Sequence, residues 1–350
     1  MNNKHRTVVA SPLTALVLVV TLLLSGATAA QEEASVGDKL TEALDLYTQA
    51  YPEKALEVAR GQIERDDLTA TDSIAVYEVL SIITYSMGKT YLNQSFGYLE
   101  KISEIGTCEV PLPREIWPSE LRNKWFDILH KTNSLSCGSL QKPGVTTVAV
   151  MEFDNFSIGK YQEELGPIGK GLADFFEHDF AKISEVKVIE RDKINFVLNE
   201  LELQKSGAVD QSTAVEVGKI LGAKFMIFGS ITQLDDDQTR MVVRLVSVET
   251  SEIIASVDRE GKPNYSDMEK ELVDDLANKM NVKISDEEKS EIQKGGTESA
   301  TATTFYAKGL EYMDRYDYEK AYDYFKKAYE KDPEFAEAKR KMEIYEPLVS

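Results

Sequence analysis

Few residues that bind metals or act as nucleophiles occur in this sequence. Its 350 residues include two cysteines and three histidines. Only His130 and His178 lie beyond the N-terminal segment, and neither stands at zinc-ligand spacing from a cysteine. The Gly-x-Ser-x-Gly and His-Glu-x-x-His motifs of common hydrolases are also missing. We therefore expect no enzyme activity, no cofactor, and no catalytic or metal-binding residues.

Basic residues are outnumbered in the chain. It has 40 lysines and arginines against 60 aspartates and glutamates, a formal net charge of −20 at pH 7. Binding to nucleic acid or to an anionic membrane through bulk electrostatics requires basic patches. The charge therefore argues against nucleic acid as a partner. It favours solubility and leaves room for a cationic partner.

Long apolar runs are lacking except near the N-terminus. Lys4 and Arg6 precede the apolar residues 13–24, a run of signal-peptide length that is short for a membrane span. Residues 1–30 are thus predicted to be a signal peptide cleaved before Gln31 or one residue earlier, with an uncleaved anchor as the alternative. No cysteine follows the run and no later stretch reaches transmembrane length. The sequence predicts an exported protein without a lipid anchor or a transmembrane segment after cleavage.

The two cysteines, Cys108 and Cys137, are predicted to form a disulfide. Export takes both to an oxidising compartment, where paired cysteines in one domain are usually bridged. The bridge would join a proline-rich loop to a helix. Two separate buried thiols are the alternative.

Residues 31–132 have the pattern of a helical domain. Apolar residues recur at helical spacing, and Pro52 occupies a helix start, as proline favours. Thr71 or Asp72 is expected to cap the third helix, and two tryptophans, Trp117 and Trp125, are expected in the core. Helix pairs with short turns suggest tetratricopeptide-like (TPR-like) hairpins. The polar residues 133–144 are expected to form a linker.

Residues 145–283 alternate between strand and helix patterns. Strands are expected at 146–153, 186–188, 225–231, 241–248 and 253–257, with helices between and after them. This order predicts a compact mixed α/β domain, so the whole chain is predicted to be an α+β multidomain protein. The charged and then Gly- and Thr-rich residues 284–302 are expected to form a second linker.

Residues 303–350 contain the clearest motif. Small and aromatic residues fall at the spacings of one TPR: Phe305, Gly309, Tyr312, Tyr318, Ala321, Phe325, Ala328 and Pro333. Lys308 departs from the motif, because an apolar residue is usual there. A further helix is expected to cap this C-terminal hairpin. Since one repeat rarely buries enough surface alone, we expect it to dock on the rest of the chain or on another copy.

Two stretches suggest ligand chemistry, and a structural role is favoured for each. Gly166-Pro-Ile-Gly169-Lys170-Gly171 lacks the glycine spacing and the Ser/Thr of a phosphate-binding loop, which favours a helix start with small residues against the sheet. Glu190-Arg191-Asp192 lies at a strand end, where α/β domains often bind ligands. We expect Asp192 to cap the next helix and Arg191 to pair with a carboxylate. The alternative is an enzyme that uses Glu190 and Asp192.

Four segments of the central domain resemble the CsgG-like family of envelope proteins, which includes the curli secretion component and is related in fold to LpoB-type activators. They are VAVMEF at 148–153, IERDKI at 189–194, LGAKFMIFGSI at 221–231 and RLVSVETSEII at 244–254. The resemblance implies a three-layer α/β domain and a location in the periplasm or at the outer membrane. It also implies partners among envelope proteins, with self-association as a further option.

The resemblance leads to two hypotheses for function. The first is an exported, non-enzymatic adaptor or assembly factor of the bacterial envelope. The alternative is an LpoB-like activator of a penicillin-binding protein. A curli-type secretion component is disfavoured, because the turn at 233–239 is too short for membrane strands and the lipidated cysteine is missing.

Overall fold

The computed structural model describes residues 34–106, 116–136, 144–201 and 210–349. They form two compact units, one up to residue 125 and one from residue 126 to 345, which are described separately. The predicted signal peptide and both cysteines lie outside the described residues, so the disulfide stays a prediction. Within the described ranges, no helix combines the length and apolar character needed to cross a membrane.

The first unit is helical, as the sequence predicts. Its helices are α2 Val36–Thr48, α3 Pro52–Ile63, α4 Ala70–Ser86, η1 Lys89–Tyr91 and α5 Leu92–Ile105, and α6 Ser119–Lys131 spans the division between the units. The expected cap of α4 was wrong, because Thr69 is the N-cap. Asp72 is instead the third helical residue of a capping box, and its Oδ2 accepts from Thr69 N at 2.9 Å.

Both tryptophans are buried in this unit, as expected. The rings of Trp117 and Trp125 meet edge to face, with centroids 6.5 Å apart. Trp117 Nε1 donates to the Glu78 carbonyl oxygen at 3.2 Å. A buried indole whose N–H has a partner is typical of a core residue, and here it ties the segment before α6 to α4.

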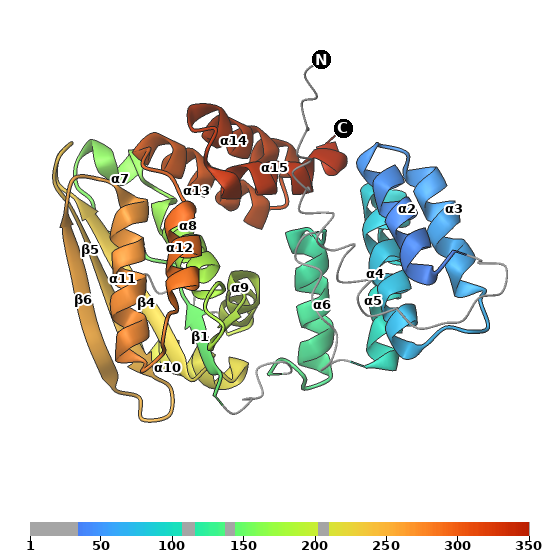
Figure 1. Ribbon diagram of the computed structural model, residues 1–350, viewed down its shortest axis with the longest axis horizontal. Coiled ribbons are helices and arrows are strands. Elements are labelled where there is room, and N and C mark those ends of the chain that lie inside the picture. The colour runs from blue at the N-terminus through green and yellow to red at the C-terminus, as the bar shows by residue number, and fades with distance from the viewer. Residues whose placement is uncertain (1–33, 107–115, 137–143, 202–209, 350) are drawn as a thin grey trace, which may run out of the picture. The chain divides into compact units, whose positions relative to one another are not determined.

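The second unit is built on one mixed sheet (Figure 1). Its strands are β1 Thr146–Val150, β2 Asp154–Asn155, β3 Val186–Ile189, β4 Phe225–Gln233, β5 Thr239–Ser247 and β6 Ile253–Gly261. The order is β3-β1-β4-β5-β6, and β2 pairs with β4 beyond the end of β1. Strands β3, β1 and β4 are parallel, whereas β4, β5 and β6 form an antiparallel meander. The predicted order of elements from 186 to 257 is confirmed.

Helices connect and cover these strands. They are α7 Lys160–Glu164, α8 Ile168–Phe180, α9 Arg191–Glu200, α10 Gln211–Leu221 and α11 Tyr265–Lys279. Residues of α8 and α11 share one core with the sheet, including Phe176, Leu272 and Ile227. The connection from β1 to β3 runs across the sheet in one direction, and the connection from β3 to β4 runs in the opposite direction. Right-handed crossovers therefore place α8 and the pair α9–α10 on opposite faces.

The glycine-rich start of α8 is explained by close packing. A Cβ atom at Gly169 would lie 1.8 Å from the Phe153 carbonyl oxygen, and Phe153 N donates to Gly169 O at 3.3 Å. A Cβ at Gly171 would lie 3.1 Å from Ala307 Cβ. The stretch is thus a helix start with small residues at close contacts, as favoured from the sequence.

The expected linker at 284–302 is corrected by the structure. It contains α12, Asp286–Lys294, which begins with a capping box between Ser285 and Glu288. Hydrogen bonds from the Ser184 and Ser285 backbone lower the pKa of Glu288 to about 2. Ile292 is buried in the core shared with α8 and α11. The segment reads as a linker in sequence because little of α12 is apolar apart from Ile292.

The C-terminal hairpin consists of α13 Ala300–Asp314 and α14 Tyr318–Lys331, followed by α15 Ala336–Val349. A Cβ atom at Gly309 would lie 2.5 Å from the Phe325 ring, so glycine allows the two helices to approach. The hairpin packs on α8, where Phe175 stacks on Tyr306 with ring centroids 5.7 Å apart. The expectation that it docks on the rest of the chain is confirmed.

Replacing Gly169 by alanine should destabilise the second unit by about 1–3 kcal/mol, because the added methyl group overlaps the Phe153 backbone. Gly97→Ala in α5 is the matched control, since nothing lies within 4 Å of its Cβ position. Helix propensity alone predicts that this control is stabilising by about 0.5–1 kcal/mol. Urea unfolding measures both changes. Equal effects of the two substitutions would contradict the close approach at Gly169.

Candidate functional site

Large apolar side chains are exposed together on one face of the sheet. Phe156 N donates to Ile231 O at 2.8 Å and Ile158 N to Gln233 O at 3.3 Å, so this segment continues the β2 pairing beside β4. Since side chains alternate along paired strands, Phe156, Ile158 and Leu234 point to the same side. They are 53, 55 and 45 % exposed. We call these three residues the apolar sheet face.

Charged side chains of β5 border the apolar sheet face. Arg240 lies opposite Thr232 and Arg244 opposite Phe228, on the side to which Leu234 points. Arg240 Nε lies 3.2 Å from Asp258 Oδ2, and the Arg244 guanidinium carbon lies 6.0 Å from the Phe228 ring centroid. An exposed apolar patch with a polar rim is typical of a protein interaction site.

A second candidate site lies at the carboxyl ends of β1 and β3. Helices α8 and α9, which follow these strands, lie on opposite faces of the sheet, and α/β domains usually bind ligands at such a point. Arg191, the first residue of α9, is only 3 % exposed there. Its guanidinium makes a two-pronged contact with Asp314 of α13, with Nη1–Oδ2 at 3.0 Å and Nη2–Oδ1 at 2.7 Å.

Lys170 is the second cation of this strand-end cluster. Its Nζ lies 2.6 Å from Glu152 Oε1 and 2.8 Å from Asp314 Oδ2. Burial alone would raise the pKa of the Asp314 carboxyl, but Arg191 and Lys170 outweigh burial and hold that pKa below its usual range. The cluster is therefore a set of mutually neutralised charges in which the hairpin supplies the central carboxylate.

The structure tests both expectations for Glu190-Arg191-Asp192. Arg191 pairs with carboxylates, as expected. The expected cap was wrong, because Glu190 is the N-cap of α9 and makes no side-chain cap bond. Asp192 lies within the first turn, with Oδ1 3.5 Å from Arg191 Nη2. Its carboxylate thus lies beside the neighbouring arginine, within the first turn of the helix rather than at the cap position.

Polar contacts extend the docking of the hairpin along α8. Tyr306 Oη donates to Asp174 Oδ2 at 2.7 Å, and Lys341 Nζ of α15 lies 3.7 Å from Asp174 Oδ1. His178 Nε2 lies 3.2 Å from Glu337 Oε1. Burial lowers the pKa of His178, against the attraction of Glu337. Helix α8 therefore occupies the surface formed by α13 and α15.

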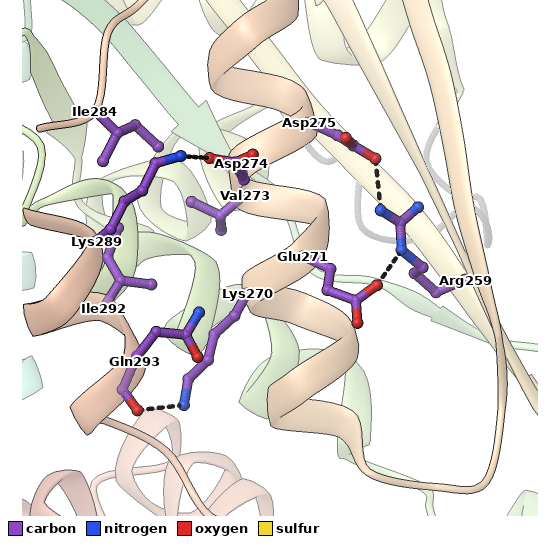
Figure 2. Close-up of a pocket in the computed structure, with 10 residues that line it drawn as sticks. All are labelled: Arg259, Lys270, Glu271, Val273, Asp274, Asp275, Ile284, Lys289, Ile292 and Gln293. Atoms are coloured by element: carbon purple, nitrogen blue, oxygen red, sulfur yellow. Dashed lines mark hydrogen bonds and ion pairs between the residues drawn. The ribbon is translucent and has the colours of Figure 1, made fainter. Parts of the chain in front are cut away.

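A pocket of 360 Å³ is lined mainly by residues of α11 and α12 (Figure 2). Arg259 Nε lies 2.5 Å from Glu271 Oε2, and its Nη2 lies 2.7 Å from Asp275 Oδ2. Lys289 Nζ lies 3.0 Å from Asp274 Oδ1. These charges are paired with one another, so we assign them to holding α12 and β6 against α11. In the described ranges, no group of three or more His, Cys, Asp or Glu residues could hold a metal ion.

The predicted motif residues divide into a buried and a partly exposed set. Ala321, Phe325 and Ala328 are fully buried, and Gly309 is buried against Phe325. Tyr318, at the start of α14, stacks on Tyr345 with ring centroids 5.2 Å apart. Exposed Pro333 follows the end of α14, as expected. Phe305 and Tyr312 are half-buried, as is Tyr318, and the rings of Phe305 and Tyr312 contact Tyr324.

Sequence reasoning missed the residues that join the hairpin to the sheet domain. Tyr306, not Tyr312, is the fully buried aromatic of α13. Asp314, Asp174 and Glu152 were not singled out, because any acid looks alike in a chain so rich in them. The available signal was Arg191, since a strand-end arginine in a buried segment requires a carboxylate partner.

Comparison with known proteins gives one family match. Residues 132–243 match the family model of the curli production assembly/transport component CsgG. The match supports the expected CsgG-like domain, covers about a third of the chain, and is consistent with a protein of the cell envelope. A comparison with curated proteins gave no match.

Solved structures give more distant similarities. The LpoB C-terminal domain from Escherichia coli is 16 % identical, with a TM-score of 0.28 over 39 % of this chain and 96 % of that one. The same domain from Salmonella enterica is 17 % identical, with a TM-score of 0.27 over 37 % and 94 %. TolB from Acinetobacter baumannii is 13 % identical, with a TM-score of 0.26 over 39 % and 28 %. These scores are too low to carry a functional argument.

Asp314→Asn should destabilise the second unit by about 3–5 kcal/mol, because it leaves the buried Arg191 charge without its main partner. Asp323→Asn on the exposed side of α14 is the control and should change stability by less than about 0.5 kcal/mol. Equilibrium urea unfolding at neutral pH gives both values. A small effect of Asp314→Asn would show that the pair does not hold the hairpin.

Glu269→Gln should stabilise the protein increasingly as pH rises. Burial and the neighbouring Asp179 raise the pKa of Glu269 well above its usual range. Asp179 is itself paired with Lys182, whose Nζ lies 2.7 Å from Asp179 Oδ1. Above about pH 4.3 the unfolded chain loses this proton while the folded chain keeps it, which costs the wild type stability. The unfolding free energies of Glu269→Gln and the wild type should therefore diverge between pH 4 and 8. Exposed Glu287→Gln is the control and should run parallel to wild type; parallel curves for both variants would contradict the raised pKa.

Proposed function

We propose that this protein is an exported, non-enzymatic adaptor of the bacterial envelope, which binds a protein partner through the apolar sheet face. The observation that carries the proposal is the joint exposure of Phe156, Ile158 and Leu234 beside paired charges on β5. The family match to CsgG over residues 132–243 supports the envelope setting. The N-terminal helices and the C-terminal hairpin, which we interpret as TPR-like, would supply further binding surfaces.

The strand-end cluster supports binding rather than catalysis. In an enzyme of this architecture the crevice at the strand ends would be open to substrate. Here the carboxylate of Asp314 fills it, 2.7 Å from Arg191 Nη2, and Lys170 and Glu152 complete the cluster. The ligand-binding point of the α/β domain is used to hold another part of the same chain.

The turn between β4 and β5 supports an adaptor over a pore. These strands are joined by residues 234–238, a turn too short to contain inserted membrane strands. Leu234 opens that turn, and we assign its exposed side chain to the apolar sheet face.

Photo-crosslinking in living cells tests the proposal. A photoreactive amino acid at position 156 should yield one discrete adduct, identified by mass spectrometry as an envelope protein. The same residue at position 287, exposed on α12, is the control and should not give that adduct. Leu234→Asp should abolish the adduct at 156 without changing the unfolding free energy, because Leu234 is already exposed. No adduct at 156, or identical adducts at 156 and 287, would refute the assignment of this face.

A further inference from the structure

The C-terminal hairpin carries a row of cations on its outer side. On α14, Lys320, Tyr324, Lys327 and Lys331 recur at i, i+4, i+7 and i+11, which places them along one side of the helix. On α13, Phe305, Lys308 and Tyr312 recur at i, i+3 and i+7, and Arg315, the C-cap of this helix, follows at i+10. We call the surface formed by these eight residues the Lys–Tyr face. Helix α8 contacts other residues of α13, such as Tyr306 and Ala307.

Aromatic rings fix the positions of the cations. Tyr312 stacks on Tyr324 at 12° between planes, with centroids 5.4 Å apart. Lys320 Nζ lies 5.2 Å from the Tyr312 centroid, and Lys327 Nζ lies 4.4 Å from the Tyr324 centroid. Cation–π contacts of this kind hold an ammonium group in place while leaving its other side open. Charges held in this way lose less side-chain entropy when they bind an anion.

Several of these cations lack an acidic partner. Arg315 is paired with Glu311 and Lys320 with Asp317. Lys308, Lys327 and Lys331 form no ion pair with any residue that the structure describes. Three lysines without an acidic partner on one face are unusual in a chain whose acidic residues outnumber its basic ones and whose net charge is −20. The Lys–Tyr face therefore carries three lysines whose charge the fold itself does not pair.

We propose that the Lys–Tyr face binds an acidic peptide segment of a partner protein. Lys320 and Lys327 are seven residues apart, or about 10 Å along the helix. Carboxylates two helical turns apart in the partner match this spacing. The rest of the chain, with its excess of acids, would repel an extended anionic surface such as a membrane, whereas a peptide touches only the Lys–Tyr face. This site shares no residue with the apolar sheet face, so each of the two sites can bind its ligand independently of the other.

Fluorescence anisotropy with the full-length chain tests the proposal. The probe is a labelled helical peptide with glutamates at i, i+3 and i+7, and the reference is the same peptide with glutamines. We expect saturable binding of the glutamate peptide only, weakening as ionic strength rises. Lys327→Glu and Lys308→Glu should each weaken binding about tenfold, a change of about 1.4 kcal/mol.

The matched control is Lys326→Glu, which makes the same charge change one residue away. Lys326 is exposed, but lies off the row of Lys320, Lys327 and Lys331 and should leave the affinity unchanged. Equal losses for positions 326 and 327 would overturn the proposal in favour of diffuse charge attraction. Binding of anionic phospholipid vesicles that is lost with Lys327→Glu would overturn it in favour of a membrane site. The absence of saturable peptide binding at low ionic strength would also overturn it.

Discussion

The two-pronged contact between Arg191 and Asp314 is the interaction on which the second unit depends. It joins the end of β3 to the end of α13 across 123 positions of sequence. Because the arginine is almost completely buried, its charge requires a permanent partner in the folded state. The hairpin is therefore an integral part of the α/β unit. Helix α8 is held between the sheet and the hairpin as a consequence.

This arrangement leaves particular surfaces for binding. The strand ends, where an α/β domain usually takes its ligand, are occupied by Asp314. The surface made by α13 and α15 is occupied by α8 through Asp174 and His178. Two surfaces that stay accessible are the apolar sheet face and the Lys–Tyr face on the outer side of the hairpin. Their chemistries differ, so they suit different segments of a partner.

Much of the fold could be predicted from the sequence, because local patterns determine it. Helical spacing in the first unit, the strand order from 186 to 257 and the close approach at Gly309 all depend on nearby residues. The cap of α4 was misplaced because Thr69 and Thr71 offer the same chemistry two residues apart. Helix α12 was missed because its stability comes from burial of Ile292 and from Glu288 bonds to Ser184, which periodicity does not reveal.

The sites were harder to predict than the fold, since they depend on contacts between distant segments. Arg191 could be expected to pair, but nothing in the sequence selected Asp314 from so many acids. The exposure of Phe156 and Ile158 follows from β2 pairing beyond the end of β1, an interruption that reads as an ordinary loop. Lys308 was visible as a departure from the expected repeat motif, and the proposed binding of an acidic peptide would give that departure a role.

A double-mutant cycle on Arg191 and Asp314 tests the account most directly. Arg191→Met, Asp314→Leu and the double variant are compared with wild type by urea unfolding. The account predicts that each single change is costly, that the double variant recovers much of the loss, and that the coupling energy is about 2 kcal/mol or more. A coupling energy near zero would contradict the claim that this pair locks the hairpin onto the sheet domain.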